Sequence, residues 1–251
     1  MARRNTLHPT QYVGVTESGE VAFDLSVFDR LYLANIIITK RLTDKVIEKL
    51  VENSSRIILH MTCTGMGGSK VEPFVPTVDQ TYEKIVKLIE SGFPVEHIVL
   101  RVDPIVPTDK GTDTALAVIE KFGQTGIKRV RYSILYMYAH VKERFTKAGF
   151  PIPYSTFHAP LTVRQEIARK VNETCQKFGM TAEACGEPGI ESCSCLSQKD
   201  IDILGLTDTI ILQGNAEQRT NCHCPANKKE LLTNQAKKCP NGCAYCFWRG
   251  D

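Results

Sequence analysis

The feature that most constrains the fold of this chain is a regular alternation of strand-like and helical segments. Apolar and β-branched runs predict strands at residues 31–39, 56–62, 97–103, 129–136, 180–184 and 209–213. Segments with helical apolar spacing lie between them. Such alternation predicts an α/β fold with a parallel sheet and crossover helices. About six β/α units indicate a partial (β/α)6 TIM-like barrel that is open on one side, since a closed barrel has eight units.

The helices between these strands carry recognisable start and stop signals. One is expected to begin at Thr43, and others at residues 112–122 and 141–149. Two more are predicted to begin at capping boxes, formed by Thr77 with Gln80 and by Thr162 with Gln165. We expect residues 1–213 to form the barrel and residues 214–251 to form a Cys-rich iron-sulfur segment packed on the barrel mouth.

The ends of the predicted strands bear polar residues. Chemistry in β/α barrels lies at the carboxyl ends of the strands, where the loops project over the mouth. The candidate residues at these ends are His60, Cys63, Arg101, Asp103, Tyr136 and Glu183. Capping and loop anchoring are the structural alternatives for each, and Cys63 could also be simply buried.

Three cysteines near the end of the chain have a spacing typical of metal binding. Cys239, Cys243 and Cys246 form C-x3-C-x2-C, with Tyr245 just before the third. Each thiol can hold one iron of a 4Fe-4S cluster, which leaves the fourth iron for a small chelating ligand. Zinc is the alternative, but zinc sites usually close with four ligands, so this triplet would need a distant residue such as His223. The spacing therefore favours iron-sulfur.

This triplet resembles the motif of the radical S-adenosylmethionine enzymes, in which the free iron takes the amino and carboxylate groups of S-adenosylmethionine. Together with residues 72–77 and 100–108, it is similar to a little-characterised family related to spore photoproduct lyase. The resemblance runs from about Ile57 to Trp248. In most radical enzymes of this type the triplet follows the first barrel strand, so a terminal triplet implies a rearranged connection, and no Gly-Gly-Glu-like segment is evident.

The resemblance also implies a second metal site upstream. The preferred ligands are Cys185, Cys195, Cys222 and Cys224, with Cys193 as the alternate. Both a second 4Fe-4S cluster and a zinc site are open, because adjacent thiolates can bind different irons of one cluster.

The implied reaction assigns roles to the remaining candidates. A reduced cluster cleaves S-adenosylmethionine, and a hydrogen atom is abstracted from the substrate, which kinship suggests is a thymine-type or hypermodified pyrimidine base in DNA. Tyr245 is expected to border the adenine, and His60, Arg101 and Glu183 to bind the cofactor. Cys63, Asp103 and Tyr136 are the catalytic candidates. The implied partners are S-adenosylmethionine, DNA, and a reductant such as flavodoxin or ferredoxin.

Composition limits the location and the alternative functions. Seven of the ten cysteines fall in the last sixty residues, and the first residues lack the apolar stretch of a secretory signal. We therefore expect metal binding rather than disulfides, and a cytoplasmic protein. No apolar run approaches the roughly 18 residues that span a bilayer. The alternatives are a zinc-binding, non-enzymatic module for nucleic acid or protein, and an iron-sulfur electron-transfer protein.

Overall fold

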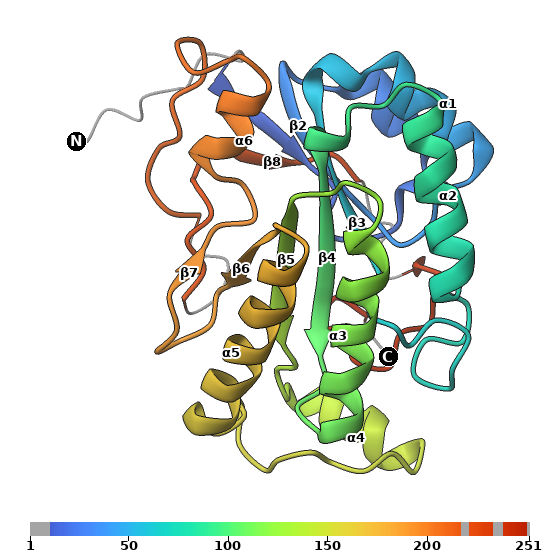
Figure 1. Ribbon diagram of the computed structural model, residues 1–251, viewed down its shortest axis with the longest axis vertical. Helices are drawn as coiled ribbons and strands as arrows, with labels where there is room; N and C mark the ends of the chain where they lie inside the picture. The colour runs from blue at the N-terminus through green and yellow to red at the C-terminus, as the bar shows by residue number, and fades with distance from the viewer. Residues whose placement is uncertain (1–10, 217–220, 233–237, 250–251) are drawn as a thin grey trace.

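The computed structural model describes residues 11–216, 221–232 and 238–249 (Figure 1). The first ten residues of the predicted barrel thus lie outside the described part. Its strands are β1 (Val13–Val15), β2 (Ala34–Thr39), β3 (Ile57–Thr62), β4 (Ile98–Ile105), β5 (Arg129–Ile134), β6 (Thr181–Cys185), β7 (Ser192–Cys193) and β8 (Lys228–Glu230).

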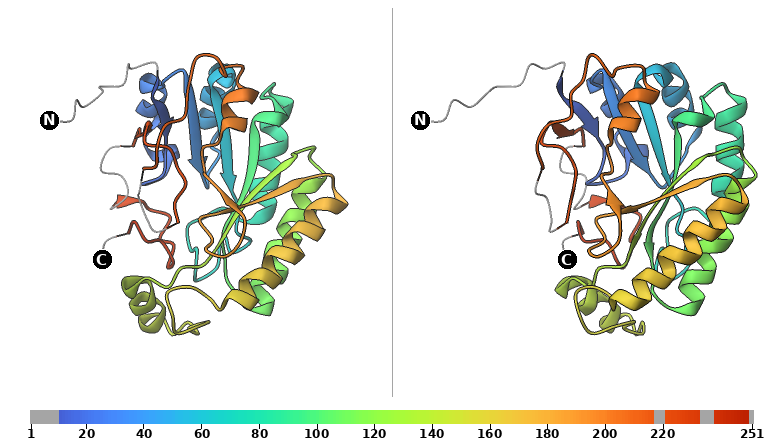
Figure 2. Two further views of the ribbon diagram at one scale, coloured as in Figure 1. Left: turned by 90° about the vertical axis from the view of Figure 1, so that its left-hand side faces the viewer. Right: turned by 60° about the vertical axis from the view of Figure 1, so that its left-hand side comes forward.

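All of these strands belong to one parallel sheet. Their order is β7-β6-β5-β4-β3-β2-β1-β8, so β2 to β6 follow one another as neighbours, and the two edges are β7 and β8. The sheet is curled (Figure 2), which is consistent with a partial TIM-like barrel. The predicted α/β class and parallel sheet are confirmed.

Helices connect the successive strands. They are α1 (Asp44–Glu52), α2 (Val78–Glu90), α3 (Asp109–Gly123), α4 (Ala139–Lys147), α5 (Leu161–Lys177) and α6 (Gln198–Ile203). Short 3-10 helices occur at Val21–Phe23, Leu25–Arg30, Ser54–Arg56 and Val95–His97. The capping box of Thr77 and Gln80 is present at the start of α2, as predicted.

The two faces of the sheet differ because side chains alternate along a strand. Leu59, Leu100 and Val130 point to the outer face, where they pack with apolar residues of α1, α2, α3 and α5 in the main core. The intervening residues point to the concave face. A smaller apolar cluster that includes Ile58 and residues of α6 closes the amino-terminal end of that face. Polar residues and cysteines line the carboxyl-terminal end of the concave face.

Two local predictions are wrong. Residues 209–213 form no strand, although their apolar run suggested one. The backbone of this segment is instead bonded by side chains: Gln11 Nε2 donates to the Thr209 carbonyl (2.9 Å) and Asn227 Nδ2 to the Ile211 carbonyl (3.1 Å). The helix expected to start at a Thr162 capping box begins at Leu161 after Pro160, with no side-chain cap.

The short strands β1, β7 and β8 were not predicted from sequence. Each has only two or three residues, which is too short for a period-2 pattern to be read. Within the described part of the chain, no helix combines the length and the apolar character needed to cross a membrane.

Candidate metal and substrate site

One cavity lies where the central parallel strands end. Its volume is about 490 Å3, within the range of small-molecule sites. Seven cysteines from two parts of the chain reach its wall: Cys185, Cys195, Cys222, Cys224, Cys239, Cys243 and Cys246. The first four are named here the upstream group, and residues 239–248 the closing loop. The fold thus brings both predicted cysteine sets to one site.

The closing loop is fixed to the mouth by polar contacts with three separate elements. The Ala244 amide donates to the Val71 carbonyl (2.9 Å), and Asn241 Nδ2 donates to the buried carboxylate of Glu20 (3.1 Å). The hydroxyl of Tyr245 donates to Glu72, and the Arg144 guanidinium donates to the Cys246 carbonyl. Four anchors on so short a segment hold its thiols against the cavity.

A tight turn allows this approach. Gly242 has φ of +68°, the left-handed region that side chains other than glycine rarely adopt. A Cβ atom there would lie 3.2 Å from the Phe74 ring and 3.3 Å from Pro73. The glycine therefore places Cys239 and Cys243 on either side of the turn.

Burial favours the neutral form of two thiols of the closing loop. Burial raises the pKa of Cys243 to about 12 and raises that of Cys239. Because the thiolate is the metal-binding form, these side chains ionise only with a strong positive partner. Lys40 is the nearest such group that the protein itself supplies to Cys243.

Lys40 and Glu72 form a buried ion pair beside the closing loop. Lys40 Nζ lies 2.9 Å from Glu72 Oε1 and 5.5 Å from the centre of the Tyr245 ring. Burial opposes ionisation of Glu72, but the Lys40 ammonium and the Tyr245 hydroxyl lower its pKa overall. Burial raises the pKa of Tyr245 well above its usual value. Tyr245 is therefore a neutral donor that fixes the loop.

The upstream group is a compact cluster of buried thiols. Cys185 Sγ and Cys195 Sγ are 3.1 Å apart, and Cys195 and Cys222 are each hydrogen-bonded with Cys224. The alternate, Cys193, is directed elsewhere, since its thiol donates to the Ala184 carbonyl (3.4 Å). The four thiols preferred from sequence are thus the ones that the fold gathers.

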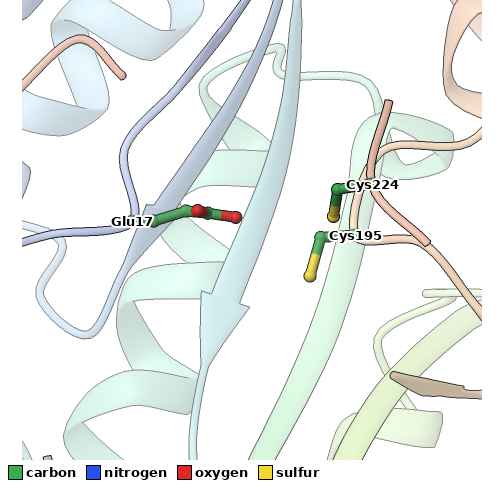
Figure 3. Close-up of side chains that lie close together, drawn as sticks. All are labelled: Glu17, Cys195 and Cys224. Carbon is green, nitrogen blue, oxygen red and sulfur yellow. The ribbon is translucent and has the colours of Figure 1, made fainter. Parts of the chain in front are cut away.

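The thiols of the upstream group come from segments next to both edge strands of the sheet. Cys195 follows edge strand β7, whereas Cys222 and Cys224 precede edge strand β8, at the other end of the strand order. Figure 2 shows the segment that crosses between the edges. Glu17, just after β1, completes the setting: its carboxylate oxygen and the sulfurs of Cys195 and Cys224 lie within 4.8 Å of one another (Figure 3).

Neighbouring groups shift the pKa values of the thiols in the upstream group. Hydrogen bonds from Cys185 and Cys224, with the nearby Arg101 and Arg131 guanidiniums, lower the pKa of Cys195 well below its usual value. The bond from Cys224 also lowers the pKa of Cys222 to about 6. The same hydrogen bonds raise the pKa of Cys224, so thiolate character in this group is favoured at Cys195 and Cys222.

Three of the predicted strand-end residues lie in the cavity wall. Arg101 Nη1 donates to Cys195 Sγ (3.3 Å), and its Nη2 donates to the Asp103 carboxylate, which also accepts from Ser133. Tyr136 donates to the Gly186 carbonyl (2.5 Å). Arg101, Asp103 and Tyr136 could therefore contact a bound molecule directly.

The other three strand-end residues are not part of this wall. His60 is fully buried, and burial with the Arg131 charge lowers its pKa well below the usual value, so it is neutral. Glu183 pairs with Arg131 at 2.5 Å. Burial raises the pKa of Cys63 to about 11, and its side chain packs in the main core. Direct cofactor or catalytic roles for these three stay predictions.

Several residues of the site were missed at the sequence level: Glu17, Glu20, Lys40 and Asn241 in the cavity wall, and Glu72, which pairs with Lys40 beside it. Lys40 follows β2 directly, so the strand-end argument could have found it. Glu20 and Glu72 lie in loops, where no pattern marks them as buried carboxylates. Asn241 stands inside the cysteine motif itself.

The distances between ligand atoms show which side chains could share a single metal ion. A single zinc ion with Zn–S distances of about 2.3 Å needs its ligand atoms within roughly 4.6 Å of one another. Among the residues that the structure describes, the group of three that meets such a limit is Glu17 with Cys195 and Cys224. The thiols of the closing loop do not converge in this way. The upstream group could hold a metal ion or a cluster, and the three thiols of the closing loop could bind a cluster, in which each thiolate ligates a different iron.

Two comparisons with known proteins bear on this site. The model of a family described as a domain of unknown function, DUF1848, matches residues 33–248, which include every cysteine of both groups. No curated protein matches the chain.

Proposed function

The chain belongs to the DUF1848 family, whose description assigns no function, and we propose that this protein is a radical S-adenosylmethionine enzyme. In this proposal Cys239, Cys243 and Cys246 hold a 4Fe-4S cluster with one open iron, and the cavity receives S-adenosylmethionine and the substrate. A protein of the flavodoxin or ferredoxin class supplies the electron.

The observation that carries the proposal is that the closing loop and the strand ends share one cavity. A cluster on this loop would lie beside the strand ends where β/α barrels place their chemistry. The volume of about 490 Å3 accommodates molecules the size of a nucleoside cofactor. A purely structural thiol site has no need of such a space.

The bound cluster supplies one-electron cleavage of the sulfonium of S-adenosylmethionine, and through it the abstraction of a hydrogen atom from an unactivated carbon. The protein's part is to position the reactants and exclude water. Lys40, Arg101 and Asp103 offer charged groups for the amino and carboxylate ends of the cofactor. Tyr245 and Tyr136 offer ring surface for the adenine. Asn241 and Gly242 keep the loop in place.

The proposed substrate is a thymine-type or hypermodified pyrimidine base in DNA. Aromatic rings at the lip of the cavity support a planar substrate, since bases stack on such rings. Tyr138 and Phe247 stack with centroids 5.6 Å apart, and Phe247 and Trp248 are about two-fifths exposed. Lys238 and Arg249 add exposed positive charge nearby for a phosphate backbone. Lys237, which is also close to these cysteines in sequence, lies outside the described residues.

The decisive experiment is anaerobic. The full chain is reconstituted with iron and sulfide, reduced with dithionite, and assayed for 5'-deoxyadenosine formed from S-adenosylmethionine. We expect cleavage by the wild type and none by Cys243→Ala. Cys175→Ala is the matched control, because Cys175 is a fully buried core thiol outside the cavity wall and should leave cleavage intact.

Other outcomes would overturn the proposal. Zinc in place of iron would favour a binding module. A reducible cluster that leaves S-adenosylmethionine intact would favour an electron-transfer protein. If Cys243→Ala still produced 5'-deoxyadenosine, the assignment of the closing loop would fail.

A further inference from the structure

One guanidinium connects the upstream group to the cavity. Arg101 lies on β4 with its side chain only 12% exposed, and it donates to Cys195 Sγ through Nη1 (3.3 Å). Through Nη2 it pairs with Asp103, which in turn accepts from Ser133. The planar fork of Arg101 thus holds a thiol of the upstream group on one side and a carboxylate of the cavity wall on the other.

The concave face beside the upstream group has buried nitrogen atoms without hydrogen-bond partners among the described residues. Arg131 is fully buried and lies within electrostatic range of Cys193 and Cys195. Its Nε and Nη1 atoms, and both ring nitrogens of His60, have no hydrogen-bond partner among the described residues. Unsatisfied buried donors cost roughly 1–3 kcal/mol each. An added negative charge at the thiols would lower the cost of leaving these groups buried.

Carboxylates pair with the cations around the upstream group. Arg101 faces Asp103, Arg131 faces Glu183 at 2.5 Å, and Lys228 places Nζ 2.8 Å from both oxygens of Glu17. Each cation therefore has one acid partner. Any negative charge that a metal with thiolate ligands brings is additional, and it would meet cations that are already in place.

We propose that Arg101 is a positioning residue that donates a hydrogen bond to a thiolate ligand of an iron-sulfur cluster in the upstream group, and that it raises the reduction potential of that cluster. The upstream site is then redox-active and not a structural zinc site. This inference rests on the proposed function for the presence of iron.

The proposed redox step is a one-electron reduction of the upstream cluster. A protein reductant of the ferredoxin or flavodoxin class gives up one electron, and a 4Fe-4S cluster with four thiolates goes from a dianion to a trianion. No bond forms or breaks, and no proton is transferred. Hydrogen bonds to ligand sulfurs and nearby positive charge favour the more negative state, so they raise the potential.

Arg101 and Asp103 give variants with opposite expected effects. Arg101→Gln removes the charge next to Cys195, so the potential should fall. Asp103→Asn removes the carboxylate that competes for the same guanidinium, so the potential should rise. Arg101→Lys keeps the charge but loses the planar fork, and it should lie between the wild type and Arg101→Gln. A purely structural role would not give shifts of opposite sign.

The test uses the full chain with Cys239, Cys243 and Cys246 all changed to Ser, so that only the upstream site can hold iron. The midpoint potential is measured by anaerobic redox titration with electron paramagnetic resonance. We expect Arg101→Gln to shift the reduction equilibrium at least tenfold, about 59 mV for a one-electron couple. Arg169→Gln, at an exposed position on α5, is the control and should not change it.

The inference is overturned if the upstream site takes zinc, if no variant shifts the potential, or if the two variants shift it in the same direction. Its failure is separable from that of the proposed function. The triple Ser background cannot cleave S-adenosylmethionine on the closing loop, so the titration reports the upstream site alone. Conversely, if the wild type made no 5'-deoxyadenosine, the enzyme proposal would fail. Opposite shifts of the midpoint potential in the Arg101 and Asp103 variants would still support the role of Arg101.

Discussion

The two cysteine regions are built in different ways. The closing loop carries three thiols within eight residues, and burial raises the pKa of Cys239 and of Cys243. The upstream group takes its thiols from three separate segments, and hydrogen bonds with guanidiniums hold the pKa of Cys195 low. The closing loop is local in sequence, and the protein offers its thiolates few stabilising partners. The upstream group is assembled by the fold, and hydrogen bonds and cations stabilise a thiolate at Cys195.

This difference indicates different duties. In the proposed function, the closing loop supplies three ligands and leaves one ligand position open for a bound molecule. The upstream group takes its thiols from segments next to both edge strands, β7 and β8, so we expect it to contribute to the stability of the fold. Both sets line the same cavity, so their consequences can be measured side by side.

The largest expected difference lies in stability. Cys195→Ser should empty the upstream site and lower the free energy of unfolding by about 3 kcal/mol, because a bound metal stabilises only the folded state. Tm should then fall by roughly 6–12 °C. Cys243→Ser should change Tm much less. Anaerobic calorimetry with metal analysis tests this, and equal decreases for both variants would break the comparison.

The next effect concerns the ion pair beside the closing loop. Lys40→Met leaves the Glu72 carboxylate buried without its cation and should cost about 3 kcal/mol of folding free energy. The double variant Lys40→Met with Glu72→Gln should recover part of it. Lys84→Met, which removes an exposed pair with Asp44, is the control and should leave stability unchanged. Urea unfolding measures all three, and equal effects at Lys40 and Lys84 would contradict the buried pair's importance.

Two buried carboxylates around the closing loop should respond to pH in opposite ways. Burial raises the pKa of Glu20 above 4.5, so its stabilising contribution is present below pH 4.5 and is lost as pH rises through the raised value. The pKa of Glu72 is lowered overall, so its contribution is present above pH 4.5 and is lost as pH falls through the lowered value.

Glu20→Gln should therefore gain stability relative to wild type as pH rises from 4.5 through the raised pKa of Glu20. Glu72→Gln should lose stability relative to wild type as pH rises through the lowered pKa of Glu72 to 4.5. Chemical unfolding at a series of pH values gives both curves. Parallel curves for the two variants would show that the two carboxylates share one environment, contrary to the hydrogen bonds described.

The smallest expected effect is at the turn of the closing loop. Gly242→Ala should cost about 1–2 kcal/mol because φ is +68°. Gly149→Ala has similar strain at φ of +69° but open space around the added methyl group. Both should reduce stability similarly, but only Gly242→Ala should reduce iron bound by the closing loop. Iron analysis of the two variants separates the turn's positioning role from backbone strain.

Sequence reasoning succeeded where the information is local. Helical periodicity and the capping box located α2 closely, and the triplet spacing identified the closing loop's thiols. It failed at residues 209–213, because Ile211 is 62% exposed and Gln11 and Asn227 bond the backbone that a neighbouring strand would have paired. It also missed Lys40, which the strand-end argument could have found, and Glu72, whose burial in a loop leaves no sequence pattern.

The pairing of β1 with β8 has a consequence for how quickly the protein can assemble. Val13 lies opposite Lys228, so one of the longest loops the chain can close must form before that edge exists. Contacts so far apart in sequence slow folding. The thiols on either side of the crossing segment therefore meet late, and iron delivered early would encounter loose cysteines with no site. The timing of metal delivery, and not only its supply, should govern how much active protein is recovered.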